Sequence, residues 1–498
     1  MKIIIKTITI VLLSFSLIGC GGEGSSAESS SFRENNNAPI INSKNTYYVN
    51  ENTRKAFQIQ ASDKSRLEYS LSGGDFFHLY IDRHSGEVFF KEATNYNKKS
   101  TYIFDINVKD IVGHFASQSI TIYVKKGTLE NPLVIETSAN HSLNGFNESD
   151  YFITTWSTDN KGTSNNKQIV IPTLGDGYNY SVDWGDGRSS KNVSKDGKHT
   201  YDTAGTYKVK IIGKFPRIYF GKDIDYNLTT INNDSRKLIA INQWGNIEWE
   251  SMAGAFTECS KLEGLTTDSP KLSKVTNMTE MFFGAEKYNQ VYLDGWDLSH
   301  VTSTAYMFAY ASSFNQYLTH WNVSNVTDMR GMFSYANTFH QYIGTWDVSH
   351  VTDMGYMFNH DTAFNAYVRN WDTSNVTDMI GMFSGASSFN QEVDKWDISK
   401  VTNMVGMFSE AKTFNQDISD WNVTNVTNMS AMFANAEIFN QDISRWNIKN
   451  VTNINYMFVN AYAFNQDLEQ WNVSNVKSMK AAFESTNSLI TKPSWYKP

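Results

Sequence analysis

Residues 382–406 read MFSGASSFNQEVDKWDISKVTNMVG, and residues 407–431 read MFSEAKTFNQDISDWNVTNVTNMSA. The two stretches align without a gap, and the pattern continues on both sides of them. Three columns recur every 25 residues: Trp296, Trp321, Trp346, Trp371, Trp396, Trp421, Trp446 and Trp471; Val301, Val326, Val351, Val376, Val401, Val426, Val451 and Val476; and Phe308, Phe333, Phe358, Phe383, Phe408, Phe433, Phe458 and Phe483. The C-terminal half is therefore a repeat array.

A period of about 20–29 residues with fixed apolar columns is typical of leucine-rich-repeat-like coils, each supplying one strand and one helix or turn. We expect Trp-x-Val-x-x-Val to be the strand. Met-x-x-Met-Phe-x-x-Ala should be a short helix, because its apolar residues fall at i, i+3, i+4 and i+7. The columns should face inward and stack into a continuous core that no single coil could bury. This half is therefore predicted to be a solenoid of strand and short-helix coils.

Several positions depart from the repeat in informative ways. Asp361 stands where alanine is usual, and Thr304 replaces a core methionine. Cys259 takes the alanine position of the first recognisable coil, so we expect a small buried residue and not a nucleophile. An asparagine column should satisfy turn amides between coils, broken once by His340: Asn289, Asn315, Asn365, Asn390, Asn415, Asn440 and Asn465.

The repeat resembles that of the BspA-like surface proteins, which reads roughly M-F-x-x-A-x-x-F-N-x-D-I-x-x-W-D-V-S-N-V-T-x-M. Residues 381–399 and 431–448 fit it closely, and the resemblance covers about 238–483. Members of that family lie on cell surfaces, and several are implicated in attachment to host or matrix molecules. The resemblance therefore implies an adhesive or ligand-binding array.

Residues 38–126 carry short apolar stretches in alternation, separated by Asp, Ser and Gly turns, which predicts an antiparallel β-sandwich. Asn37-Ala38-Pro39-Ile40 and Ala61-Ser62-Asp63 are among the motifs that resemble cadherin-like domains. Carboxylates at such positions in that family bind calcium between domains. The matching residues here are Glu51, Asp63, Asp82 and Asp110. Calcium is the one cofactor that the resemblance implies; the alternative is that these are solvated turn residues.

The sequence pattern of residues 152–213 predicts a second antiparallel sandwich. They contain Val182-Asp183-Trp184-Gly185-Asp186-Gly187, then His199-Thr200-Tyr201 and Gly205-Thr206-Tyr207, and are similar to the polycystic-kidney-disease (PKD) type of domain. Gly185 and Gly187 allow a tight backbone, and Asp186 can accept hydrogen bonds from turn amides. A metal at Asp183 and Asp186 is the weaker alternative. Such domains act as spacers or binding modules.

The chain starts like a bacterial lipoprotein. Lys2 and Lys6 precede an apolar run, 8–18, that is too short to span a membrane as a mature helix. The run ends in Leu17-Ile18-Gly19-Cys20, which resembles the lipobox and implies lipidation of Cys20. The protein should then be lipid-anchored in a bacterial envelope, facing outward on the outer membrane where there are two membranes.

The expected organisation follows from these segments. It comprises a signal peptide (1–19), a lipidated cysteine and flexible tether (20–37), the cadherin-like sandwich (38–126), a linker (127–151), the PKD-like sandwich (152–213), a connector (214–237), the array (238–483) and a C-terminal cap (484–498).

Composition excludes several functions. The chain has 43 basic and 51 acidic residues and lacks a basic run, so nucleic acid is not an expected partner. It contains no G-x-S-x-G, no H-E-x-x-H and no phosphate-cradling glycine loop, so we expect no enzyme. The second cysteine is Cys259, which leaves no intrachain disulfide once Cys20 carries lipid.

One outward position varies in an organised way. Before the inward aliphatic residue, successive coils place Tyr292, Tyr317, Tyr342 and Tyr367, and then Glu392, Asp417, Asp442 and Asp467. These predict a tyrosine ladder beside an acidic ladder, suited to sugar or protein contacts and to cations or basic partners. The alternative is that both ladders only solvate the coil surface.

We therefore expect a cell-surface adhesin or ligand-binding protein that acts through its array on a protein, matrix or glycan ligand. Two alternatives remain: a structural envelope component with homotypic, cadherin-like association, and a glycan-binding accessory protein.

Overall fold

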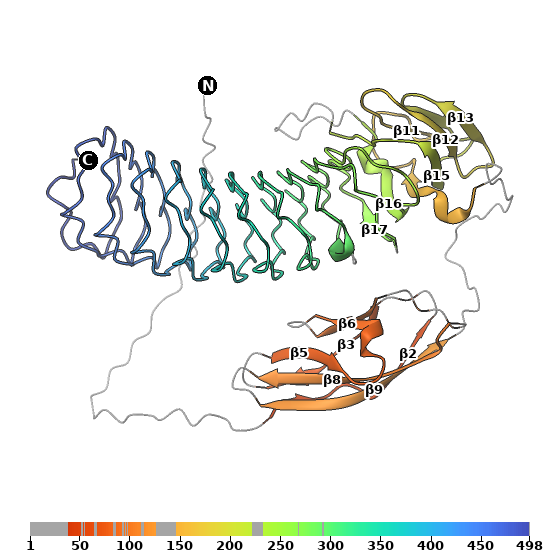
Figure 1. Cartoon of the computed structure of the whole chain (residues 1–498), viewed down its shortest axis with the longest axis horizontal. Helices are drawn as coiled ribbons and strands as arrows, with labels where there is room; N and C mark the ends of the chain where they lie inside the picture. Colours follow the sequence, from red (N-terminus) through yellow and green to blue (C-terminus); the bar gives the residue numbers. More distant parts are fainter. Residues whose placement is uncertain are drawn as a thin grey trace, which may run out of the picture. The chain divides into compact units, whose positions relative to one another are not determined.

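The computed structural model describes residues 38–497, apart from 51–52, 54, 64–66, 83–85, 92–93, 95, 97, 111–113, 126–145, 222–232, 267 and 291–292. The chain separates into two compact units, residues 1–129 and 130–498 (Figure 1). The expected signal peptide, Cys20 and the tether lie outside the described residues. No helix within the described ranges has the length and apolarity needed to cross a membrane.

The first unit is a β-sandwich. Its elements are β1 (Ile40–Ile41), β2 (Thr46–Asn50), β3 (Lys55–Gln58), β4 (Ala61–Ser62), β5 (Leu67–Ser72), the 3-10 turn η1 (Phe76–His78), β6 (Leu79–Ile81), β7 (Glu87–Phe90), β8 (Thr101–Asp110) and β9 (Phe115–Lys125). Sheets β2-β9-β8-β5 and β3-β7-β6 share one core, to which Val88, Ile106 and Ile122 contribute. The prediction of an antiparallel sandwich is wrong for one pair of strands, because β2 pairs with β9 in parallel.

The second unit begins with another sandwich. Its elements are η2 (Glu148–Asp150), β10 (Phe152–Ser157), β11 (Gln168–Ile171), β12 (Asn179–Asp183), β13 (Ser189–Val193), β14 (Gly197–Thr200), β15 (Thr206–Lys214), η3 (Ser235–Lys237), β16 (Leu238–Gln243), β17 (Glu263–Gly264) and η4 (Leu293–Gly295). The larger sheet has the order β13-β12-β15-β10-β16-β17, and β11 pairs with β14. Strands β16 and β17 come from the expected array, so the sandwich and the coils share a sheet and one continuous core.

A turn after β12 confirms the structural interpretation of the W-G-D-G motif. Gly185 and Gly187 both have positive φ, and a Cβ at Gly185 would clash with the backbone of Lys208. Asp186 accepts a hydrogen bond from the Arg188 amide (3.0 Å), and its other oxygen lies 2.8 Å from His199 Nε2. Both oxygens of the Asp186 carboxylate therefore bind groups of this sandwich and stabilise the turn.

A fully buried lysine ties this sandwich to the start of the array. Lys237 Nζ donates to the carbonyls of Ser164, Asn165 and Gln168 at 2.7–3.0 Å, and Asp234 Oδ1 lies 3.9 Å away. Desolvation lowers the pKa of Lys237. A buried ammonium is tolerated only when its protons are satisfied, and these carbonyls satisfy them. The loop 164–168 is therefore fixed against β16.

The array is a stack of coils in register (Figure 1). Parallel bridges join Asn277, Ser303, Asp328, Asp353, Asp378, Asn403, Asn428, Asn453 and Ser478 in succession. The predicted strand is wrong in position: Val326 N donates to Val323 O to close a turn, and the bridge lies beyond it at Asp328. The predicted helix is also wrong, because the described residues contain no α-helix and Met-x-x-Met-Phe-x-x-Ala forms consecutive turns.

The hydrogen bonds of one coil show why no helix forms. The amides of Met332, Ser334 and Ala336 donate three residues back within the coil. The amides that alternate with these donate to the next coil instead. Gly331 donates to Gly355 O, Phe333 to Met357 O and Tyr335 to Asn359 O, at 2.7–2.9 Å. An α-helix would direct each of them to the carbonyl four residues back. The alternation leaves one row of donors free to join neighbouring coils.

Two residues with positive φ, four apart, set this path in every coil. The first position is Gly254, Glu280, Tyr306, Gly331, Tyr356, Gly381, Gly406, Ala431, Tyr456 and Ala481. The second is Glu258, Gly284, Tyr310, Tyr335, His360, Gly385, Glu410, Asn435, Asn460 and Ser485. A right-handed helix does not accommodate residues with positive φ, so two of them, four positions apart in each coil, exclude a helix there.

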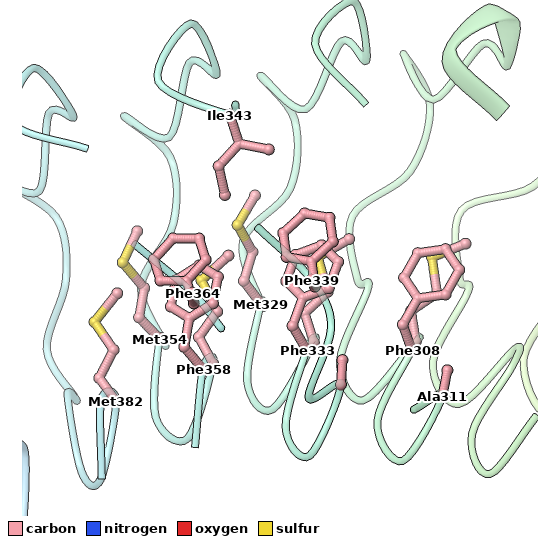
Figure 2. Packing of buried hydrophobic residues seen from close by; sticks show 14 of the residues in the cluster. Phe308, Ala311, Met329, Phe333, Phe339, Ile343, Met354, Phe358, Phe364 and Met382 are labelled. Carbon is pink, nitrogen blue, oxygen red and sulfur yellow. The ribbon is translucent and has the colours of Figure 1, made fainter. Parts of the chain in front are cut away.

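The apolar columns face inward as predicted (Figure 2). Phenylalanines of the Phe308-to-Phe483 column stack on their neighbours at centroid distances of 5.4–5.9 Å. Each column tryptophan from Trp321 onward donates its indole N–H to a backbone carbonyl, as Trp346 does to Leu318 O (2.8 Å). The predicted asparagine ladder is confirmed too, since Asn415 N donates to Asn390 Oδ1 (3.0 Å). His340 N still donates to Asn315 Oδ1 (3.1 Å), and the ladder is interrupted after His340 because histidine has no side-chain oxygen to accept from the next amide.

A pair of substitutions tests the left-handed positions. Gly406→Ala should lower the free energy of unfolding by about 1 kcal/mol, because a Cβ there meets nothing closer than ordinary contact and only backbone strain is added. Ala431→Gly, one coil further on, should leave the Tm unchanged or raise it. Tryptophan fluorescence follows this unit alone, since every tryptophan lies within 156–495. Equal losses in both variants would contradict the assignment.

Candidate functional site

The candidate site is the edge of the array that carries the tyrosine and acidic positions. Strict alternation holds there: Leu318, Ile343, Val368 and Val393 are fully buried, and the residue before each is turned toward solvent. In Figure 2, Ile343 lies on the opposite side of the coil from Ala311, so this edge lies across the coil from the turn run.

The tyrosines differ from one coil to the next. Tyr342 is exposed (44 %), Tyr317 and Tyr367 are half-buried, and Tyr292 lies outside the described residues. The structure shows no ring stacking between Tyr342 and Tyr367, although both side chains are described. Tyr342 and Tyr367 therefore do not stack on each other.

The four acids Glu392, Asp417, Asp442 and Asp467 are all exposed. Each aspartate also has a local task, because Asp417 Oδ1 accepts from Ser419 N, Asp442 Oδ1 from Ser444 N and Asp467 Oδ1 from Glu469 N, all at 2.9 Å. Bonds from the Ser444 side chain and amide lower the pKa of Asp442. These aspartates close turns in the manner expected of Asx residues.

Where the tyrosines give way to the acids, the edge holds a guanidinium. Arg369 Nε and Nη2 donate to the two oxygens of Asp394 at 2.7 Å each, and Nε lies 3.2 Å from Glu392. The guanidinium lowers the pKa of Asp394. Glu392, Asp394, Gln416 and Asp417 line a shallow hollow of about 130 Å³ beside it. Arg369 thus already occupies both oxygens of Asp394 in a bidentate contact.

A larger hollow, of about 360 Å³, lies where β10, β16 and β17 meet. It is lined by Thr155, Asn160, Ile239, Ala240, Lys261, Glu263, Leu265 and Lys287. Both charge signs occur in it, and no group of residues there carries an assignable chemistry.

The expected calcium ligands are only partly described. Glu51 lies outside the described residues, and Asp63 and Asp82 are half-buried. Asp110 is buried, and its two oxygens meet the His114 amide and Nδ1 at 2.9 Å. Within the part of the chain that is described, no three His, Cys, Asp or Glu side chains lie close enough to hold a metal ion. Calcium binding stays a prediction.

The sequence reasoning missed an aromatic stack on the other edge of the coils. Tyr310, Tyr335 and His360 stack with centroids 4.6 Å apart and planes 6° apart. Their 25-residue spacing in the sequence was a usable signal.

One buried acid lies in the core itself. Asp361 is fully buried in the alanine column, and its Oδ2 has no hydrogen-bond partner in the described structure. Burial raises the pKa of this carboxyl well above its ordinary value. By contrast, Cys259 and Thr304 are buried as expected, and burial raises the pKa of the Cys259 thiol.

Replacement of Asp361 should stabilise the array. A native pKa above the unfolded value means that the native state holds the proton more tightly, so stability falls as pH rises above about 4. Asp361→Ala should therefore raise the free energy of unfolding by about 1–3 kcal/mol at pH 7 and by less at pH 4. Thermal unfolding at both pH values measures this, and a gain independent of pH would contradict the protonation argument.

Comparisons with known proteins were made for the whole chain. Residues 250–348, 335–433 and 391–495 match the family described as "Mycoplasma protein of unknown function, DUF285", and together these matches span just under half of the chain. A search of curated proteins found no match.

Solved structures with similarity to the chain include cadherin domains. The crystal structure of human protocadherin-24 EC1-2 is 22 % identical, with 18 % of this chain and 43 % of that chain covered and a TM-score of 0.17. The crystal structure of Drosophila N-cadherin EC1-3 is 18 % identical, with 18 % and 35 % covered and a TM-score of 0.17. The third cadherin domain of human protocadherin 7 is 16 % identical, with 21 % and 100 % covered and a TM-score of 0.17. This chain thus spans less than half of the first two structures.

Proposed function

From an array that matches the DUF285 repeat family, we propose a lipid-anchored adhesin or ligand-capture protein of the bacterial cell surface. The observation that carries the proposal is the outer edge of the coils. There, tyrosines that are exposed or half-buried are followed on later rungs by exposed acids, and the stack fixes their backbone positions.

Rigid display explains why this edge suits binding. Each coil holds its neighbours by backbone bonds, so an outward side chain loses little freedom beyond its own rotamers when a ligand binds. Tyrosine offers a flat apolar body with a polar tip. The bidentate Arg369–Asp394 pair is the kind of contact that a basic partner would make with the exposed acids of the edge. An outer-membrane attachment through Cys20 would present the edge outside the cell.

The finer domain assignments support the same role. We take the first unit as a cadherin-like spacer and the sandwich of the second unit as PKD-like, on the motifs quoted above. The array is taken as BspA-like, with leucine-rich-repeat-like stacking built from turns in place of helices. Two sandwiches before an array would hold it away from the lipid surface.

The test is a binding assay of the chain without residues 1–20 on immobilised matrix proteins and glycans. A variant with Tyr292, Tyr317, Tyr342 and Tyr367 changed to serine should lose at least tenfold in affinity, because it removes the flat contact area and leaves the inward residues untouched.

A second variant separates charge from shape. Asp417, Asp442 and Asp467 changed to asparagine keep the turn-closing acceptor and remove the charge. Binding to a basic partner should weaken and lose its salt dependence. If the parent chain binds none of the surfaces offered, the proposal is wrong and the structural-component alternative takes its place.

A further inference from the structure

The turn-run edge of the array carries aromatic side chains at its left-handed positions over three coils. Tyr306, Tyr310, Tyr335, Tyr356 and His360, here called the aromatic strip, all have φ between 54° and 59°. The same two positions in the following coils hold Gly381, Gly385, Gly406, Glu410, Ala431 and Asn435. The coil path is the same in both regions, so the backbone does not require an aromatic residue there.

Local backbone preference argues against these residues. Glycine and asparagine adopt positive φ readily, whereas a bulky side chain there is strained. Strained residues held by a stable surrounding structure are found preferentially where the side chain has a task. Stacking of the rings offsets part of the strain, but aromatic residues are not required for contact between coils: Asn460 Nδ2 donates to Asn435 Oδ1 (2.8 Å) at the same positions.

The geometry of the strip defines what it presents. Tyr310, Tyr335 and His360 cover one another's faces at 4.6 Å, and Tyr306 and Tyr356 lie over Gly331 and Gly381, where a Cβ would clash with their rings. Tyr310 is exposed and the other four side chains are half-buried, so part of each ring reaches solvent. Among the described residues, the hydroxyls of Tyr310, Tyr335 and Tyr356 have no hydrogen-bond partner.

His360 adds an acceptor to this row. Its Nδ1 lies 3.2 Å from Asn359 Oδ1, and the tautomer with the proton on Nδ1 can donate to that oxygen. Nε2 of the neutral ring is then an acceptor beside the phenol donors.

These features favour a linear polysaccharide over a protein surface. A stable protein interface needs about 800 Å² on each side and a desolvated apolar centre. The strip is at most two side chains wide at each rung, and stacking already covers the faces that Tyr310, Tyr335 and His360 turn toward one another. Tyr310 and Tyr335 instead place hydroxyl groups on neighbouring coils, at the coil spacing of about 4.8 Å. The hydroxyls of a linear sugar chain also recur at short, regular intervals. The positive ring edges suit sugar oxygens.

We propose that the aromatic strip is a second ligand-binding surface and that it takes a linear polysaccharide. The proposal rests on the ligand-capture function above but uses a different edge of the coils, so the two can fail separately.

The test compares three chains without residues 1–20: the parent, Tyr310→Asn/Tyr335→Asn/His360→Asn, and the matched control Tyr456→Asn. Tyr456 has the same φ (58°) and is exposed, but lies in a coil outside the strip. The probes are linear oligosaccharides of cellulose, chitin, xylan, mannan and hyaluronan on an array, followed by calorimetry with any that bind. We expect the triple variant to keep the parent Tm and to bind at least tenfold more weakly, while Tyr456→Asn binds within twofold of the parent.

Tyr310→Phe/Tyr335→Phe tests the hydroxyls without disturbing the stack, and a loss of severalfold in affinity is expected. Unchanged saccharide binding by the folded triple variant would overturn the strip and leave the proposed function standing. Binding of the parent to matrix proteins but to no oligosaccharide would overturn the polysaccharide assignment alone. If the parent binds neither class, both proposals fail.

Discussion

The structure of the array depends on one backbone constraint: two left-handed residues, four positions apart, in every coil. They interrupt any helix and direct alternate amides out of the coil. Within 329–336, for example, Met332, Ser334 and Ala336 satisfy their amides locally, and the residues between them donate to the next coil. A single coil would leave those donors unsatisfied, which is costly once they are buried. The coils are therefore stable only as a stack, and the stacked Phe, Trp and Met columns follow from that registration.

A stack held together in this way needs both ends closed. At the first coil, β16 and β17 extend the sheet of the sandwich, and Lys237 fixes the adjoining loop. At the last, Trp495 stacks on Trp471 at 6.2 Å and donates its indole N–H to Leu468 O (2.9 Å), as a further coil would. The sandwich thus shares one continuous core with the coils. The expected boundary at 237/238 marks where β16 starts, but packing continues across it.

The columns could be read from the sequence because a residue that must stack on its own copies has to recur at the coil period. The same reasoning found the asparagine ladder and the buried roles of Cys259 and Thr304. The helix was wrong for a physical reason. Apolar spacing of i, i+3, i+4 and i+7 reports which side chains face inward, and a run of turns produces that spacing as well as a helix does. Glycine would have marked the left-handed positions, but Tyr306, Glu280 and Ala431 occupy them in other coils and conceal the pattern. The parallel pairing of β2 with β9 and the carbonyl cage of Lys237 join segments distant in sequence, which local patterns do not encode.

Surface residues of the array also divide into those that the backbone favours and those that it does not. Outward positions of a repeat are free to vary, so a residue carries functional information where it is not what the backbone favours. Asp417, Asp442 and Asp467 close turns, and local structure alone explains why an aspartate stands there. Tyr342 has no such explanation and is exposed. Tyr310 and Tyr335 go further, since they stand where the backbone favours glycine or asparagine. The tyrosines are therefore the surface residues whose presence local backbone structure does not account for, and the proposed ligands would account for them.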